Sequence, residues 1–252
     1  MAEVFTPSWL CNAQNNLIDN AWFEREGVFN SEIVLSNGAK SWEVNLDKIL
    51  FPKSKTWKDY IKDKRLEISC GEAPYITSRY DSTTGEFILV QNRIGILDRK
   101  LRIINENTET ESEWLKATIA AYRNTYAFEW QGDSLLIARE AILTTFIENY
   151  KHQFDEAPSL KNIQIIADVI SWNVWQMDGL KGVIPDSCSD NTEITEDLFG
   201  HKTAQTKECN GCKFNNILTH NGNYCIIKDW DEKDSLTKEI GKRIRFVDLL
   251  NK

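Results

Sequence analysis

The sequence predicts an α/β fold with a mostly parallel central sheet, and three observations support this. Short apolar runs alternate with helical patterns across residues 61–185. The three clearest runs each end on an acidic residue or a glycine turn. With 252 residues and 41% hydrophobic content, the chain can also bury a core without disulfide bonds. Alternating strands and helices are typical of a parallel sheet that is covered by helices.

Hydrophobic spacing places the individual elements. Strands are expected where short apolar runs lie between turn residues, and helices where apolar residues recur every three to four positions. The expected strands are residues 65–69, 126–129, 171–176 and 243–250, and the expected helices are residues 114–122, 134–152 and 159–170. The spacing within residues 81–110 does not decide between helix and extended chain.

Changes in composition divide the chain into four parts. Residues 1–60, rich in Asn and Trp, form an irregular N-terminal segment, and residues 61–185 form the α/β core. Residues 186–232 are a polar, Cys-rich insertion, and residues 233–252 return to the core as its terminal strand. One α/β domain with an insertion is therefore expected.

The charge balance limits the partners. A net charge of −8 argues against electrostatic capture of nucleic acid, so DNA would bind only weakly to this chain alone. No apolar run approaches the roughly 20 residues that span a bilayer, and the first residues lack a basic start leading into an apolar signal core. The expectation is a cytoplasmic protein that does not enter a membrane.

Acidic residues and glycines at the strand ends are the candidate ligand-binding groups. Glu129 closes an apolar run and precedes a helical pattern, a position from which a carboxylate can accept hydrogen bonds from a ribose diol. The adjacent Trp130 could place an apolar face against an adenine ring. After the earlier run, Gly71 lets a backbone approach a ligand closely because it has no Cβ.

Taken in order, these motifs resemble the S-adenosylmethionine half of the adenine-specific (N6) DNA methyltransferases of restriction–modification systems. The resemblance extends over roughly residues 3–250 and implies a Rossmann-like S-adenosylmethionine-dependent methyltransferase sheet. Glu67, Cys70 and Gly71 match the acid and the glycine of the family's first motif. Two positions depart from that motif: Ile68 replaces a proline, and Ala73 replaces a second glycine.

The same resemblance assigns cofactor contacts to other residues. Phe5, Thr6 and Pro7 match a Phe-x-Pro element that lies against the cofactor. Glu129 matches the acid that binds both ribose hydroxyls, and Trp130 the apolar residue that follows it. Asp178 matches the acid that accepts from the adenine amino group, although an Asp-Gly pair after a strand is also an ordinary turn.

The family's catalytic tetrapeptide, Asn/Asp/Ser-Pro-Pro followed by an aromatic residue, does not occur in these 252 residues. Residues 244–251 resemble the strand that leads into it. The expectation is a split or incomplete enzyme whose protein partner supplies the catalytic loop and target recognition, so no catalytic residue is assigned. The alternatives are a catalytically inactive methyltransferase-like regulatory protein that acts through protein–protein contacts, and an enzyme whose acceptor is protein or RNA.

The cysteines of the insertion suggest a metal site. Cys209, Cys212, His220 and Cys225 form a Cys-x2-Cys-x7-His-x4-Cys pattern, which offers four ligands suited to tetrahedral zinc. Its polar surroundings could not order this segment by apolar burial, so a metal would do so. Cys188 or His201 could replace one ligand, and free thiols in a loop are the alternative.

Overall fold

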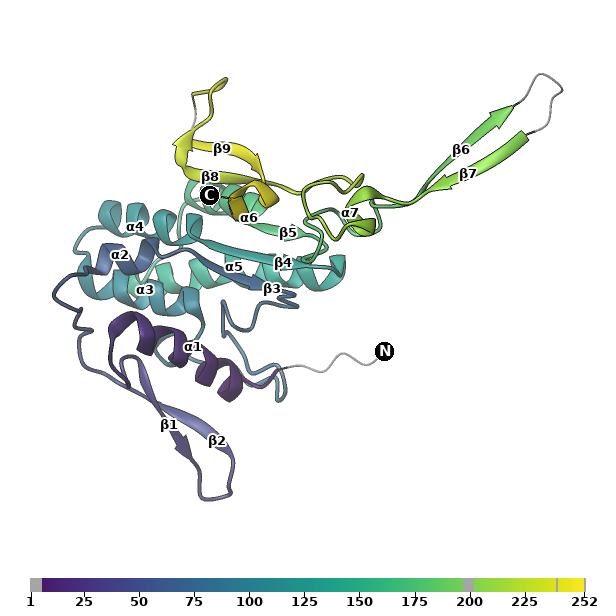
Figure 1. Cartoon of the computed structure of the whole chain (residues 1–252). Helices are drawn as coiled ribbons and strands as arrows, with labels where there is room; N and C mark the ends of the chain where they lie inside the picture. The colour runs from purple at the N-terminus through teal and green to yellow at the C-terminus, as the bar shows by residue number, and fades with distance from the viewer. Residues whose placement is uncertain (1–5, 197–201, 239, 252) are drawn as a thin grey trace.

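The protein has a mixed α/β fold with several small sheets and a cluster of Cys and His side chains (Figure 1). The computed structural model describes residues 6–196, 202–238 and 240–251. In these ranges, no helix is long and apolar enough to span a membrane.

Three parallel strands form the central sheet. Strand β4 (Thr125–Glu129) lies between β3 (Arg65–Ile68) and β5 (Val174–Gln176). The register pairs Leu66 with Tyr126, and Phe128 with Trp175. Parallel neighbours require long crossovers, and helices provide them. The expected strands at residues 65–69, 126–129 and 171–176 are therefore present, although β5 is shorter than expected.

Four helices make the two crossovers. Helices α3 (Ile96–Asn107) and α4 (Glu111–Arg123) connect β3 to β4, and helices α5 (Gly132–Phe154) and α6 (Leu160–Asn173) connect β4 to β5. Helix α3 lies within residues 81–110, where the sequence spacing did not decide between helix and extended chain. The side chains of Thr110 and Ser159 accept backbone N–H groups at the starts of α4 and α6, which fixes where these helices begin. Their apolar faces form the main core together with β4. A short 3-10 helix, Val90–Asn92, precedes α3.

The N-terminal segment is more regular than expected. It contains helix α1 (Ser8–Phe23), a hairpin of β1 (Asn30–Val34) and β2 (Lys40–Val44), and helix α2 (Trp57–Lys62). Its aromatic side chains, including Phe23, Phe29 and Tyr60, belong to the main core. The residues before β3 are thus part of the α/β core.

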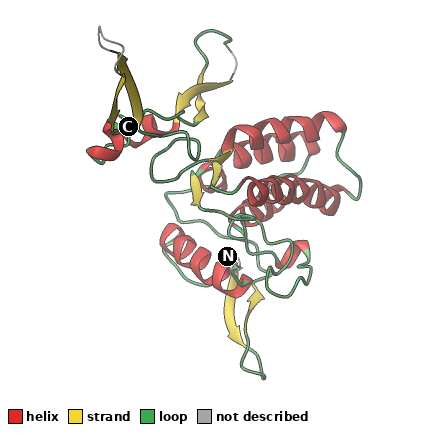
Figure 2. Cartoon of the chain, turned by 90° about the vertical axis from the view of Figure 1, so that its right-hand side faces the viewer, coloured by secondary structure: helices red, strands yellow, loops and turns green. Residues whose placement is uncertain are grey.

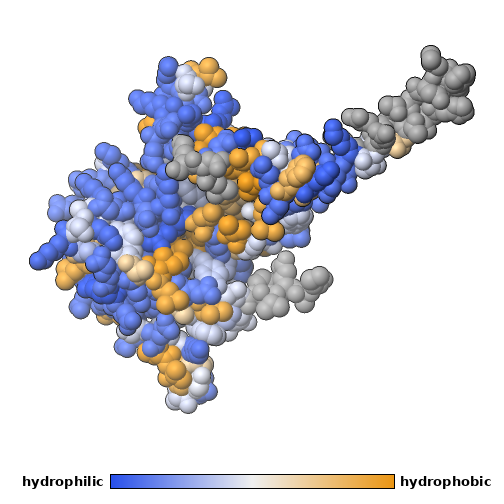
Figure 3. Space-filling view, viewed as in Figure 1, coloured by the Kyte–Doolittle hydropathy of each residue, from blue (hydrophilic) through white to orange (hydrophobic). Residues whose placement is uncertain are grey.

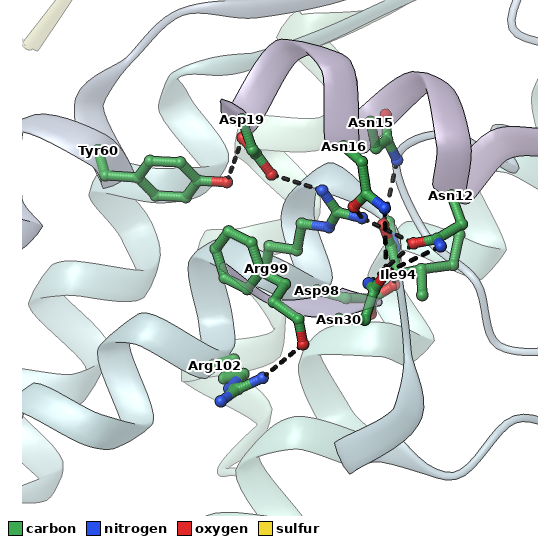
Figure 4. Close-up of polar contacts among 12 residues, drawn as sticks. Asn12, Asn15, Asn16, Asp19, Asn30, Tyr60, Ile94, Asp98, Arg99 and Arg102 are labelled. Atoms are coloured by element: carbon green, nitrogen blue, oxygen red, sulfur yellow. Dashed lines mark hydrogen bonds and ion pairs between the residues drawn. The ribbon is translucent and has the colours of Figure 1, made fainter. Parts of the chain in front are cut away.

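A buried polar network joins α1 to α3 (Figure 4). Arg99 Nη1 lies 2.6 Å from Asp19 Oδ2, and Arg99 Nη2 donates to Asn12 at 2.9 Å and to Asn16 at 2.8 Å. The hydroxyl of Tyr60 donates to the other Asp19 oxygen at 2.9 Å. The buried guanidinium is therefore both paired and hydrogen-bonded, as burial of a charge requires.

The C-terminal residues differ from the expectation. Strand β8 (Ile226–Lys233) pairs antiparallel with β9 (Ile240–Arg245), so β9 is not a strand of the β3-β4-β5 sheet, and the 3-10 helix Phe246–Asn251 follows it. Phe246, in the 3-10 helix, packs edge-on against Phe128 with ring centroids 4.6 Å apart, within a second core cluster on the other face of β4.

The insertion carries the remaining elements. Strands β6 (Asn191–Glu196) and β7 (Lys202–Lys207) form an antiparallel hairpin that extends away from the rest of the chain, and helix α7 (Asn210–Lys213) follows (Figures 1 and 2). The Cys and His cluster lies at the base of this hairpin.

Candidate functional site

A cavity of about 410 Å³ lies where β3 and β4 end. The carboxyl ends of parallel strands meet at one edge of the sheet, which is where open α/β sheets bind ligands. Residues from the N-terminal segment, the β3 turn, the end of β4 and the first turns of α5 line it: Thr6, Glu67, Ser69, Cys70, Gly71, Glu72, Pro74, Tyr75, Glu129, Ser134 and Ile137.

The turn after β3 has an unusual backbone. Ser69, Gly71 and Ala73 have φ angles of 57°, 56° and 64°, in the left-handed region. A Cβ added to Gly71 would meet no atom within 4 Å, so the backbone conformation, and not crowding, favours glycine there. Ala73, although not a glycine, has the left-handed conformation that glycine adopts most readily.

Glu129 connects this turn to α5. One carboxylate oxygen accepts the Gly71 N–H at 2.6 Å, and the other accepts the N–H groups of Trp130 at 2.8 Å and Gln131 at 2.9 Å. A carboxylate has about four acceptor positions, and these bonds use three of them. Glu129 therefore shapes the cavity wall and keeps some capacity to accept from a ligand.

Glu67 is the second carboxyl group of the cavity. Its Oε2 is shielded from solvent and has no hydrogen-bond partner among the described residues. Burial raises the pKa of Glu67 well above its usual value, the N–H groups of Tyr75 and Ile76 oppose this, and the neighbouring Glu129 carboxylate adds to it. A raised pKa favours the protonated carboxyl, which can donate one hydrogen bond to a ligand and accept others.

Cys70 lines the cavity as a neutral thiol. Burial raises its pKa, and the carboxyl groups of Glu67 and Glu129 raise it further. The thiolate is the reactive form of cysteine, so this environment makes Cys70 a poor nucleophile. Its Sγ lies 3.6 Å from the Gly71 carbonyl oxygen, which fits a structural role in the turn.

The structure brings some of the predicted cofactor residues to the cavity and leaves others away from it. Thr6 lines the cavity, whereas Pro7 precedes α1 as its N-cap residue and does not line it. Trp130 is 41% exposed and also lies outside the lining. Phe5 lies outside the described residues. Sequence reasoning missed Glu72, Tyr75 and Ser134, which only the folded turn and the start of α5 bring to the cavity.

Asp178 closes a turn after β5. Its Oδ1 accepts the N–H groups of Leu180 at 3.0 Å and Lys181 at 3.2 Å, and its Oδ2 lies 3.6 Å from the Lys181 ammonium. Asp178 is absent from the cavity lining. This geometry corresponds to the turn that an Asp-Gly pair commonly makes.

A second candidate site is the cluster of Cys188, Cys209, Cys212 and His220, whose ligand atoms all lie within 4.8 Å of one another. The Cys188 sulfur is 3.3 Å from that of Cys209 and 3.6 Å from that of Cys212. His220 Nδ1 lies 3.5 Å from the Cys188 sulfur and 3.7 Å from each of the other two. Tetrahedral zinc with ordinary bond lengths places sulfurs about 3.8 Å apart and sulfur and nitrogen about 3.6 Å apart. The cluster therefore fits a metal ion.

The fourth residue of this cluster is Cys188 and not Cys225, which corrects the expected ligand set. Cys225 is 1% exposed, and its backbone is held by Gly182 and Phe246 beside β5. Its Sγ faces the Gln176 carbonyl oxygen at 3.6 Å, and burial raises its pKa to about 12. Cys225 therefore packs in the second core cluster and not beside Cys209 and Cys212. His201 lies outside the described residues.

Two local features prepare the cluster for a cation. A Cβ added to Gly211 would lie 2.4 Å from His220 Nδ1, so only glycine allows the imidazole to approach the Cys209–Cys212 turn. Burial alone would raise the pKa of Cys209, but the backbone N–H groups of Cys212 and Asn221, together with the side chains of Cys188 and His220, lower it to about 6. Metal binding requires thiolates, and Cys209 readily provides one.

Comparisons with known proteins give no assignment. No family model matches the chain, and no curated protein and no solved structure matches it.

Proposed function

We propose that this chain is the S-adenosylmethionine-binding part of an adenine-N6 DNA methyltransferase of a restriction–modification system, completed by a protein partner. One observation carries the proposal: Glu129 and the Gly71 turn lie on neighbouring parallel strands and border one cavity at the carboxyl ends of those strands. In open α/β sheets this is the position of nucleotide-like ligands.

The cavity groups suit the parts of that cofactor. The free acceptor capacity of Glu129 suits a ribose hydroxyl, and the unpartnered oxygen of Glu67 suits a hydrogen-bonding group of the cofactor. Open space beside Gly71 allows a ligand to approach the backbone. When bound, S-adenosylmethionine supplies the methyl group, and the residues of this chain bind and orient it.

A protein partner is supported by the exposed edge of the sheet. Among the described strands, β3 has β4 as its only neighbour, and its Leu66 and Ile68 side chains are 43% and 53% exposed. Figure 3 shows apolar surface across the middle of the face on which β3 lies. Exposed apolar edge strands favour pairing with a further strand, and a partner could provide one.

For the cluster of Cys188, Cys209, Cys212 and His220, we infer a structural zinc ion. Three thiolates and one imidazole fill a tetrahedral shell and leave no position for a reacting water. The ion would hold together the base of the β6–β7 hairpin and α7.

The second candidate is a catalytically inactive methyltransferase-like protein that acts through protein contacts. Two observations favour it. Most hydrogen-bond acceptor positions of Glu129 are occupied by backbone N–H groups of this chain, and Asp178 closes a turn outside the cavity. Such a protein would retain the sheet but would not bind S-adenosylmethionine.

Calorimetric titration with S-adenosylmethionine separates the two candidates. We expect saturable binding by the wild-type chain and a loss of about 1–3 kcal/mol in Glu129→Ala. Glu140→Gln, an exposed change on α5 outside the cavity, is the matched control and should bind normally. No binding by a folded wild-type chain would refute the cofactor-binding proposal and leave the second candidate. If the cofactor binds, methyl transfer to DNA is then assayed with the partner chain present. Persistent inactivity would refute the proposal that DNA is the methyl acceptor.

A further inference from the structure

A groove of about 620 Å³ lies at the opposite end of the sheet from the cofactor cavity. It runs along α4 and α6 and is bordered by α2 and β8. Lys62 and Asn124 line it just before β3 and β4 begin, whereas the cavity lies where these strands end. A molecule in the groove is thus separated from the cavity by the length of the strands.

The groove carries positive charge on an acidic chain. Lys62, Lys116, Arg123 and Lys161 line it, although the chain has a net charge of −8. The one carboxylate in the lining, Asp231, lies 2.7 Å from the ammonium of Lys64 and is neutralised by it. The groove therefore attracts anionic groups.

Beside these cations the lining includes four apolar side chains. Leu115, Ile119 and Ala120 come from α4 and Ile165 from α6, and all four are half-buried. Cations beside an apolar floor match a ligand that has both apolar side chains and carboxylates, as an amphipathic helix in a groove does.

Arg123 is the most specific feature of the groove. Its Nε is buried and has no hydrogen-bond partner in the described part of the chain, and its guanidinium lies 4.8 Å from the Trp230 ring centroid. Lys228 lies 4.9 Å from the same ring, and the indole N–H donates to Asn173. Trp230 is thus engaged with cations of its own chain and is poorly placed to stack on a nucleic-acid base.

We propose that this groove binds an acidic amphipathic helix of a partner protein. The apolar floor would receive one face of that helix, and the four cations would meet carboxylates along its edges. The engagement of Trp230 with Arg123 and Lys228 argues against nucleic acid. The proposal does not depend on cofactor binding.

The test uses a fluorescent synthetic peptide of about five helical turns, with leucines on one face and glutamates on the other. Its binding to the full chain is measured by anisotropy. We expect saturable binding that weakens about tenfold in the double variant Lys116→Glu with Lys161→Glu and that falls with rising salt. The matched control is Lys48→Glu with Lys53→Glu, which reverses two exposed lysines outside the groove.

Competition experiments test which ligand chemistry the groove recognises. A glutamate homopolymer should compete poorly because it cannot use the apolar floor, and a single-stranded DNA oligonucleotide should compete poorly because no base can stack on Trp230. Failure of the peptide to bind would overturn the proposal. An equal loss of peptide affinity in the groove variant and in the control variant would overturn it too. Tighter binding of either competitor would overturn it as well. Circular dichroism confirms that every variant is folded.

Discussion

Gly71 shows at the residue scale how one backbone angle shapes the cavity. Its φ of 56° is left-handed, and space around its Cβ position is free. We expect Gly71→Ala to destabilise the protein by about 1–2 kcal/mol through backbone strain alone. Urea unfolding measures the change. Gly132→Ala, at the first residue of α5 where a Cβ makes only ordinary contact at 3.5 Å, should be neutral or slightly stabilising, and equal losses would contradict the strain argument.

The raised pKa of Glu67 should make the free energy of unfolding depend on pH. Its pKa is raised in the folded chain, mainly by burial, so above the unfolded pKa of about 4.3 the folded state binds more protons than the unfolded state. Its contribution to stability is therefore complete at low pH and declines as pH rises toward the folded pKa. Glu67→Gln removes this decline.

We accordingly expect Glu67→Gln to be more stable than the wild type at pH 7 and similar to it near the unfolded pKa of about 4.3. Denaturant unfolding across this range measures the difference, with Glu140→Gln as a control that leaves the wild-type profile unchanged. A constant difference at every pH would show that Glu67 acts through contacts other than its charge. Weaker S-adenosylmethionine binding by the stabilised variant would support a ligand role.

At the scale of elements, the cysteine ligands are tested by a matched pair of substitutions. Cys188→Ser removes a side chain of the cluster, whereas Cys225→Ser changes a buried thiol that faces Gln176. We expect zinc content, measured by mass spectrometry of metals after dialysis, to fall in Cys188→Ser and to stay at the wild-type level in Cys225→Ser. The reverse result would restore the ligand set expected from the sequence spacing.

The elements also show what hydrophobic spacing can predict. It located β3, β4 and β5 because each is a short run between turns, and it located α4, α5 and α6 because their apolar spacing is helical. It did not find the pairing of β9 with β8, since a strand pattern carries no information about the neighbouring strand. Phe246, just after β9, packs against Phe128 of β4, a contact that the strand pattern also did not reveal.

At the scale of the whole molecule, the Asp19–Arg99 pair attaches the N-terminal segment to the core. Asp19→Ala would leave the buried guanidinium without its partner, at a cost of about 3–5 kcal/mol. Glu232→Ala breaks the exposed pair with Lys242 and should cost less than about 1 kcal/mol. Thermal unfolding compares the two. Similar small losses would show that α1 is held by its apolar contacts alone.

The α/β character, the order of the strands along the chain and the residues at their ends could be predicted from the amino-acid sequence, because hydrophobic period and turn chemistry are local. The sequence also indicated a metal site in the insertion. Only the tertiary structure decided which of these residues meet. It placed Glu67, Gly71 and Glu129 around one cavity, left Trp130 and Asp178 outside it, and exchanged Cys225 for Cys188. The physical reason is that these groupings depend on strand neighbours and core contacts between residues far apart in the chain.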